Sequence, residues 1–83
     1  MENEKDTSKY CKIEIYYDNN QIERIGYYKD GLKNGEWKFW YKDGQLGQVV
    51  NYLDGELNGE YKTWLPNGNT NEIFTYQKGE LVR

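Results

Sequence analysis

The sequence predicts an all-β protein in which consecutive antiparallel β-hairpins form one elongated, twisted repeat sheet. Two observations predict this fold class: an internal duplication with a period of 24 residues, and Asx-Gly turn pairs flanked by alternating aromatic and β-branched residues. A third observation argues against helices, because the chain has nine glycines and no sustained i, i+3, i+4, i+7 apolar pattern.

The duplication defines the units of the chain. Tyr28, Tyr52 and Tyr76 stand 24 residues apart, and the stretches that follow the first two align without a gap. A weaker copy precedes them, in which Cys11 stands where the later units have glycine; as the lone cysteine, it is predicted to be a small core residue. We expect a flexible N-terminal segment at 1–9 and one β-repeat domain at 10–83, with units at about 4–27, 28–51 and 52–75 and a stub at 76–83.

The turn residues predict where each hairpin reverses. Asp43-Gly44 and Asn67-Gly68 are pairs that favour φ > 0 at both central positions of a two-residue type I′ turn. Asn19-Asn20 takes the same place in the first unit, since Asn tolerates φ > 0. The segments "DGLKNG" and "DGELNG" are interpreted as crossings between successive hairpins.

A two-residue turn fixes which side chains share a face of the sheet. In the second hairpin it opposes Tyr41 to Leu46 and Trp40 to Gly47, and directly opposed residues share a face. With 36% hydrophobic and 17% aromatic residues in 83, the core is expected to be thin. The predicted apolar core face holds Ile13, Ile15, Tyr17, Ile22, Trp37, Phe39, Tyr41, Leu46, Val50, Tyr61, Leu65 and Phe74.

The opposite face alternates charged residues with an aromatic column. Two interpretations stay open: the column packs against a second layer, such as a loop, the terminal stub or another copy, or it is exposed and anchors a partner protein. The open strand edges also invite β-augmentation or a homodimer. This face is predicted to hold Glu14, Tyr16, Ile25, Lys38, Trp40, Val49, Lys62, Trp64 and Ile73. The predicted partner-binding residues are Trp40, Trp64, Tyr16, Lys38, Lys62 and Glu60.

The residue types present argue against catalysis and metal binding. The chain has no histidine, which removes Ser-His and Cys-His catalysis and the usual zinc sites. Its glycines form neither a G-x-G-x-x-G loop nor a G-K-[ST] loop, and each Asp beside a Gly is expected to cap a turn instead of binding calcium. We expect no enzymatic activity, no cofactor and no metal.

Charge restricts the class of partner. The net charge is -3, and no run of Lys or Arg forms the basic stripe that nucleic acid or an anionic membrane requires. Residues 28–51 carry a net charge of +1 and residues 52–75 a net charge of -3, so the C-terminal half offers an acidic surface. The N-terminal stretch "MENEKDTSKY" has no apolar h-region. We expect a cytoplasmic protein with neither a nucleic-acid nor a membrane partner.

The stretches "YKDGLKNGEWKFWYKDGQL" and "YLDGELNGEYKTWLPNGNT" resemble the variant MORN repeat, a bacterial relative of the membrane occupation and recognition nexus repeat. Both match its pattern Y-x-x-G-x-x-x-G-x-[WY]-x-x-[WY]-x-x-[ND]-G, and the resemblance covers about 28–81 closely and 10–27 loosely. It implies antiparallel hairpins in one elongated sheet. Because many bacterial members are described as antitoxin-like or immunity-type proteins, it also implies a small intracellular binder of a toxin.

These observations together predict a small protein-binding inhibitor of the immunity, antitoxin or anti-defence kind, which acts by occluding a toxin or defence effector. One alternative is a scaffolding repeat module that assembles through strand edges or the Trp stripe. Another is glycan binding, because "WKFWYKDGQ" is similar to the aromatic-Gly hairpins of cell-wall-binding repeats.

Overall fold

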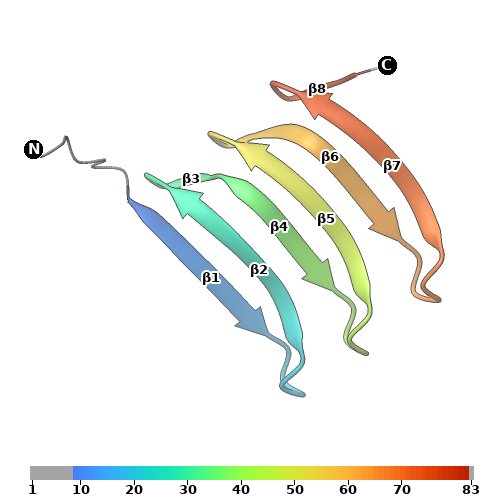
Figure 1. The fold of residues 1–83 in the computed structure, drawn as a ribbon. Helices are drawn as coiled ribbons and strands as arrows, with labels where there is room; N and C mark the ends of the chain where they lie inside the picture. The colour runs from blue at the N-terminus through green and yellow to red at the C-terminus, as the bar shows by residue number, and fades with distance from the viewer. Residues whose placement is uncertain (1–8, 83) are drawn as a thin grey trace, which may run out of the picture.

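The computed structural model describes residues 9–82, which form one open antiparallel sheet in the order β1-β2-β4-β5-β6-β7-β8, with β3 pairing with β2 (Figure 1). The predicted fold class is confirmed. Of the predicted flexible segment 1–9, all but Lys9 lies outside the described residues. The strands are β1 (Tyr10–Tyr16), β2 (Ile22–Lys29), β3 (Leu32–Lys33), β4 (Gly35–Trp40), β5 (Leu46–Leu53), β6 (Glu56–Trp64), β7 (Thr70–Gln77) and β8 (Glu80–Leu81).

The two-residue turns lie at the opposite end of the sheet from the one predicted. Asp30-Gly31 has φ of 51° and 84°, Asp54-Gly55 has 50° and 88°, and Lys78-Gly79 has 51° and 83°. Positive φ at both central positions is the requirement of a type I′ turn. The residues that flank these turns pair directly, as Leu53 does with Glu56. The segments interpreted as crossings are therefore tight hairpins themselves.

The turns predicted at Asp43-Gly44, Asn67-Gly68 and Asn19-Asn20 are three-residue loops, so the prediction of type I′ turns there was wrong. In the second hairpin Gly44 N donates to Tyr41 O at 3.0 Å and Tyr41 N donates to Gln45 O at 2.8 Å. Only the last loop residue has positive φ, 95° at Gly44 and 70° at Asn20. Asp43 instead accepts a hydrogen bond from Gln45 N at 3.0 Å through Oδ1, which caps the loop.

A β-bulge beside each loop restores the predicted register. Phe39 pairs with Gln48 but Trp40 pairs with Leu46, which leaves Gly47 as the extra residue. The longer loop and the bulge offset each other, so Trp37 pairs with Val50 as predicted. Between the loop and the bulge, the residues of the second strand of each hairpin lie on the face opposite the predicted one. Ile22 opposes Tyr16 and Leu46 opposes Trp40, so Ile22 and Leu46 share the face of Tyr16 and Trp40.

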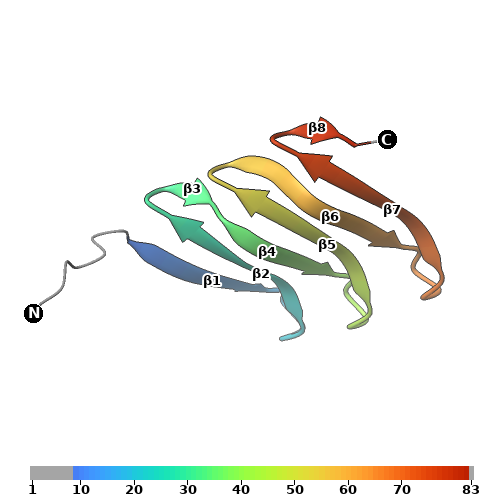
Figure 2. The ribbon, with the colours of Figure 1, turned by 45° about the horizontal axis from the view of Figure 1, so that its top comes forward.

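The sheet is a single layer of 52 × 38 × 19 Å, and no element within residues 9–82 covers either of its faces (Figure 2). Burial therefore comes from neighbouring side chains on the same face. Trp37 and Val50 are 1% and 2% exposed, and Val49 on the opposite face is 9% exposed. The predicted apolar face is thus only partly a core, since Ile15 remains 43% exposed. Cys11, predicted in the core, is exposed on β1, because a single layer cannot cover its outermost strand.

Trp37 is the centre of the small core. Its ring lies against Gly26, where an added Cβ would lie 2.1 Å from the ring, so only glycine fits there. Tyr28 and Tyr52 meet the ring edge-on at centroid distances of 5.2 and 6.2 Å. The Lys33 ammonium lies 5.0 Å from the ring centroids of both Trp37 and Tyr52. One tryptophan therefore joins β2, β4 and β5.

Candidate functional site

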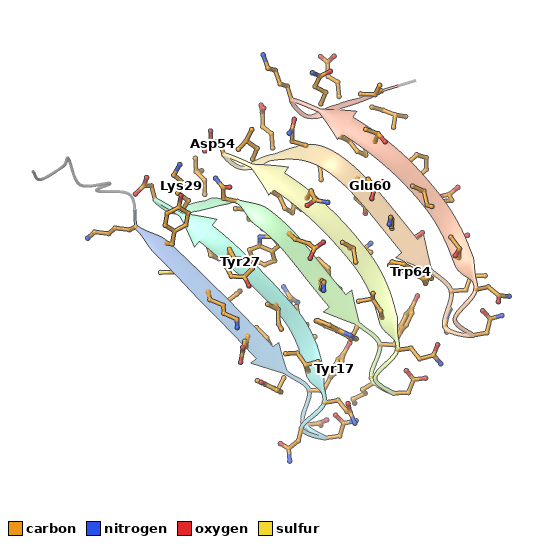
Figure 3. The ribbon with its side chains drawn as sticks, viewed as in Figure 1. Tyr17, Tyr27, Lys29, Asp54, Glu60 and Trp64 are labelled. Carbon is orange, nitrogen blue, oxygen red and sulfur yellow. The ribbon has the colours of Figure 1, made fainter. Side chains whose placement is uncertain are left out.

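The predicted partner-binding residues lie on one face of the sheet, here called the column face, which carries Tyr16, Lys38, Trp40, Glu60, Lys62 and Trp64. The register pairs Trp40 with Leu46 and Trp64 with Thr70, so the aromatic column is interleaved with smaller side chains. Tyr16 is 54% exposed, whereas Trp40 and Trp64 are half-buried. The column is consequently less exposed than a free aromatic ladder. Figure 3 shows Trp64 near the loop end of β6 and Glu60 farther along the same strand.

The charged residues of the column face form ion pairs along each strand. Lys38 Nζ lies 3.6 Å from Glu36 Oε1, and Lys62 Nζ lies 3.2 Å from Glu60 Oε1. In β1 the lysine precedes the glutamate along the strand instead of following it, and Lys12 Nζ lies 3.1 Å from Glu14 Oε2. Exposed pairs of this kind contribute little to stability. The predicted binding charges are therefore available to a partner at small cost.

The electrostatics of Tyr16 follow from its contact with Glu14. The Tyr16 hydroxyl donates to Glu14 Oε1 at 3.1 Å, and this hydrogen bond to the carboxylate raises the pKa of Tyr16. The pKa of Glu14 is lowered, chiefly by its hydrogen bond from Lys12 and then by that from Tyr16. The pKa of Lys12 is raised by the same contact with Glu14. Lys12 and Glu14 therefore favour their charged, paired state, and Tyr16 favours its neutral hydroxyl, which donates to Glu14.

The opposite face, here called the groove face, carries Trp37, Phe39, Val50, Tyr61 and Phe74. A groove of about 720 Å³ crosses it between β4 and β7. Its lining includes Phe39, Leu57, Tyr61, Phe74 and Tyr76, and Glu72 is the one charged residue among the described lining residues. Trp40 and Trp64, two of the predicted partner-binding residues, also border the groove. Tyr61 meets Phe74 edge-on at a centroid distance of 6.4 Å. The groove is thus an aromatic surface with one carboxylate at its side.

Two polar groups lie among the aromatics of the groove. Gln48 Nε2 donates to the Tyr61 hydroxyl at 3.2 Å. The Thr63 Oγ1 is buried and has no hydrogen-bond partner within residues 9–82. A buried hydroxyl without a partner costs stability.

Two tyrosines tie the loop ends of neighbouring hairpins together beside the groove. The Tyr17 hydroxyl donates to Trp40 O at 2.6 Å, and the Tyr41 hydroxyl donates to Trp64 O at 2.7 Å. Both donors and both acceptors are 24 residues apart, and Leu65 takes the third position. Sequence reasoning missed these contacts, although aligning positions 17, 41 and 65 would have marked the two tyrosines as equivalent. It also missed Gln48, Thr63 and Glu72.

The described residues offer surfaces for contact and no metal centre. Within residues 9–82, no three His, Cys, Asp or Glu side chains gather as metal ligands. In the same range, no helix is long and apolar enough to cross a membrane. What the structure presents is two side-chain faces and open strand edges, which are the features of a binding or scaffolding sheet.

This architecture is that of a β-hairpin repeat module. A family model described as "MORN repeat variant" matches residues 12–30, 33–54 and 57–78. The chain therefore belongs to the MORN repeat variant family, a non-catalytic repeat module. No curated protein and no solved structure matches the chain.

Proposed function

We propose that the protein is an inhibitor that binds a segment of another protein in its groove and occludes that partner. The observation that carries this proposal is the groove of about 720 Å³ on an aromatic face that nothing within residues 9–82 covers. Its volume falls within the ~300–1,000 Å³ of ordinary ligand sites. Tyr and Phe side chains supply large contact areas with little loss of conformational entropy.

The lining indicates the chemistry of the partner segment. Glu72 is the one charge among the described lining residues, and residues 52–75 carry a net charge of -3. A basic side chain would pair with this carboxylate and lie over the neighbouring aromatic rings. The partner segment is therefore apolar with at least one Lys or Arg.

Occlusion is the mode of action that these features support. The chain belongs to a family of repeat modules, and a sheet that binds a partner segment in its groove would inhibit by covering that segment. The immunity, antitoxin or anti-defence role belongs to this proposal, and so does the cytoplasmic location. Neither a nucleic acid nor a membrane is proposed as a partner, since the net charge is -3.

A displayed library of random peptides, selected on the purified full chain, tests the groove. The selected peptides are expected to combine apolar residues with Lys or Arg, and E72Q and F74A are expected to weaken their binding. Ile73→Ala is the matched control, because Ile73 is 56% exposed on the column face of the same strand. The double variant Y16A/K62A tests the column face, because neither residue lines the groove whereas Trp40 and Trp64 border it; it is expected to bind the selected peptides as the unaltered chain does. Peptides that bind F74A and E72Q as well as the unaltered chain would remove the groove from the proposal.

The scaffolding role remains the second candidate, and one observation favours it. Within residues 9–82, β1 has a neighbour on one side only, and β8 pairs only with Tyr76 and Gln77 of β7. Open edges of this kind recruit further strands.

A further inference from the structure

The outer edge of β1 is open along its length. β1 pairs with β2 from Tyr10 to Tyr16, and no strand in the described part of the chain pairs with its other side (Figure 2). Edge strands are commonly protected by proline, a bulge, a short length or charged side chains, and the one lysine of β1, Lys12, is paired with Glu14 at 3.1 Å. β1 has seven residues without Pro or Gly, and the bulge of its hairpin lies on β2, where Glu23 is the extra residue. Its backbone groups are ready to pair with another strand.

The sequence of this edge, "YCKIEIY", is symmetric in chemistry about Ile13. Reversing it places Tyr on Tyr, the two apolar residues Cys11 and Ile15 on each other, and Lys12 on Glu14. We infer that β1 pairs antiparallel with β1 of a second copy about a two-fold axis at Ile13, which joins two sheets into one. The contact is isologous, as is usual for two-fold dimers.

Each opposed pair across the axis is favourable. Lys12 faces Glu14 of the second copy, and the pair occurs twice by symmetry, on the column face. Cys11 faces Ile15 of the second copy on the groove face. Ile15 is 43% exposed, and Tyr10, which faces Tyr16 of the second copy, is 62% exposed. Opposite charges and aromatic pairs at directly opposed positions stabilise a sheet, whereas like charges destabilise it.

The charges also exclude the neighbouring registers. A slip of two residues in one direction opposes Lys12 to Lys12 of the second copy, and a slip in the other direction opposes Glu14 to Glu14. Only the register centred on Ile13 opposes unlike charges. Because strand register is otherwise weakly specified at an open edge, this pattern fixes it.

Continuation of the repeat from one copy to the next fits less well. Within the chain, Ile25 of β2 pairs with Lys38 of β4. The same junction between β7 and β1 of a second copy would oppose Ile73 to Glu14, whereas the junctions within the chain oppose Ile25 to Lys38 and Val49 to Lys62. Leu65 stands where Tyr17 and Tyr41 donate their hydroxyl hydrogen bonds, so the contact between neighbouring loop ends would be missing as well.

Charge reversal tests the pairing through mass measurements of the full chain in solution. K12E and E14K each place like charges across the axis, and each is expected to weaken the dimer about tenfold or more. An equimolar mixture of the two is expected to form a heterodimer, and the double variant K12E/E14K a homodimer. The intrachain Lys12–Glu14 pair is lost in both single variants, so it cannot explain recovery on mixing. A monomeric unaltered chain at ~1 mM, or a mixture that stays monomeric, would refute the inference.

A cross-linking experiment tests the register. Ile15→Cys places a new thiol opposite Cys11 of the second copy, within reach of a disulfide after small adjustment, so mild oxidation is expected to give covalent dimers. The unaltered chain is expected to stay uncross-linked, because its two Cys11 residues would lie about 13 Å apart. Thr75→Cys on β7 is the control for continuation of the repeat, in which β7 of one copy would lie beside β1 of the next. A ladder of linked chains from T75C, without dimers from I15C, would show continuation of the repeat and overturn the inference. Peptide binding by E14K separates this surface from the groove, which β1 does not line.

Discussion

Gly26 is buried against the Trp37 ring across the junction of two hairpins, and Gly26→Val is expected to be strongly destabilising. Even a single Cβ at Gly26 would lie 2.1 Å from the indole ring, and Trp37 is 1% exposed. Trp37 must therefore move out of its site. Overpacking alone costs about 1–3 kcal/mol, and full displacement approaches the ~3–5 kcal/mol of truncating a buried Trp. We expect a loss of about 3 kcal/mol.

That loss is large for a domain of this size, whose free energy of unfolding is about 4–12 kcal/mol. In urea denaturation followed by Trp fluorescence, the midpoint is expected to fall by about 2 M for an m-value of about 1.5 kcal/mol/M. Gly31→Ala is the control for backbone effects. Gly31 has φ of 84° and nothing within 4 Å of an added Cβ, so only conformational strain should appear there.

The next junction supplies a rescue variant. Twenty-four residues later, Val50 occupies the position of Gly26 and pairs with Tyr61, which occupies the position of Trp37. The double variant G26V/W37Y therefore copies a combination that the chain already uses. We expect it to recover most of the stability lost in G26V, measured as a coupling energy in a double-mutant cycle. An equal cost of G26V in the Trp37 and W37Y backgrounds would refute the steric explanation.

Three further predictions concern single groups. Tyr41→Phe removes the hydrogen bond to Trp64 O and is expected to cost about 1 kcal/mol in the same urea assay; an unchanged midpoint would contradict a structural role for that bond. Thr63→Val replaces a buried hydroxyl that has no partner among residues 9–82 and is expected to stabilise the chain by about 1 kcal/mol; lost stability would show that the hydroxyl is satisfied. The lowered pKa of Glu14 means that its contribution to stability is present above its ordinary value of 4.5 and is lost as pH falls through the folded-state pKa. An NMR titration is expected to show the pKa of Glu14 rising in Lys12→Met, and an unchanged pKa would rule out Lys12 as its main cause.

The repeat period and the alternation of residues predicted the strand pairing in the middle of each hairpin, but they did not predict the length of its loop. Pairing of Trp37 with Val50 followed from alternation and held in the structure. The dipeptide Asp43-Gly44 fits both a two-residue type I′ turn and the end of a three-residue loop, because each needs φ > 0 at the glycine. The choice depends on the bulge at Gly47, across the strand pair, which no local pattern marks. Leu46 therefore lies on the face opposite the predicted one.

The groove could not be predicted because it depends on the absence of a second layer within the described residues. Alternation placed Phe39, Tyr61 and Phe74 on one face, and that face was predicted to be a buried core. In a single-layer sheet the same residues are left half-buried. Cys11 was misplaced for the same reason. Alternation along a strand predicts which residues share a face of the sheet, but it does not predict whether another layer covers that face.

The position of the groove follows from how the repeat changes along the chain. Arg24, Gln48 and Glu72 are equivalent positions on the groove face. The Arg24 guanidinium lies 5.5 Å from the Phe39 ring centroid and covers it. Gln48 is shorter and bonds only the Tyr61 hydroxyl, and Glu72 lines the groove. The aromatic surface thus becomes more open toward the C-terminal unit.

The apolar residues change in the same direction. The side chains at the equivalent positions Gly26, Val50 and Phe74 increase in size along the chain. On the following strand, the Trp37 ring lies against Gly26, and Tyr61 pairs with Val50. Within residues 9–82 no strand pairs with Phe74 on its outer side, because β8 pairs with Tyr76 and Gln77 of β7. The Phe74 ring therefore lines the groove. The proposed partner segment would therefore lie over the C-terminal unit, where Phe74 and Glu72 line the groove, and not over the N-terminal unit, where Arg24 covers Phe39 and the Trp37 ring lies against Gly26.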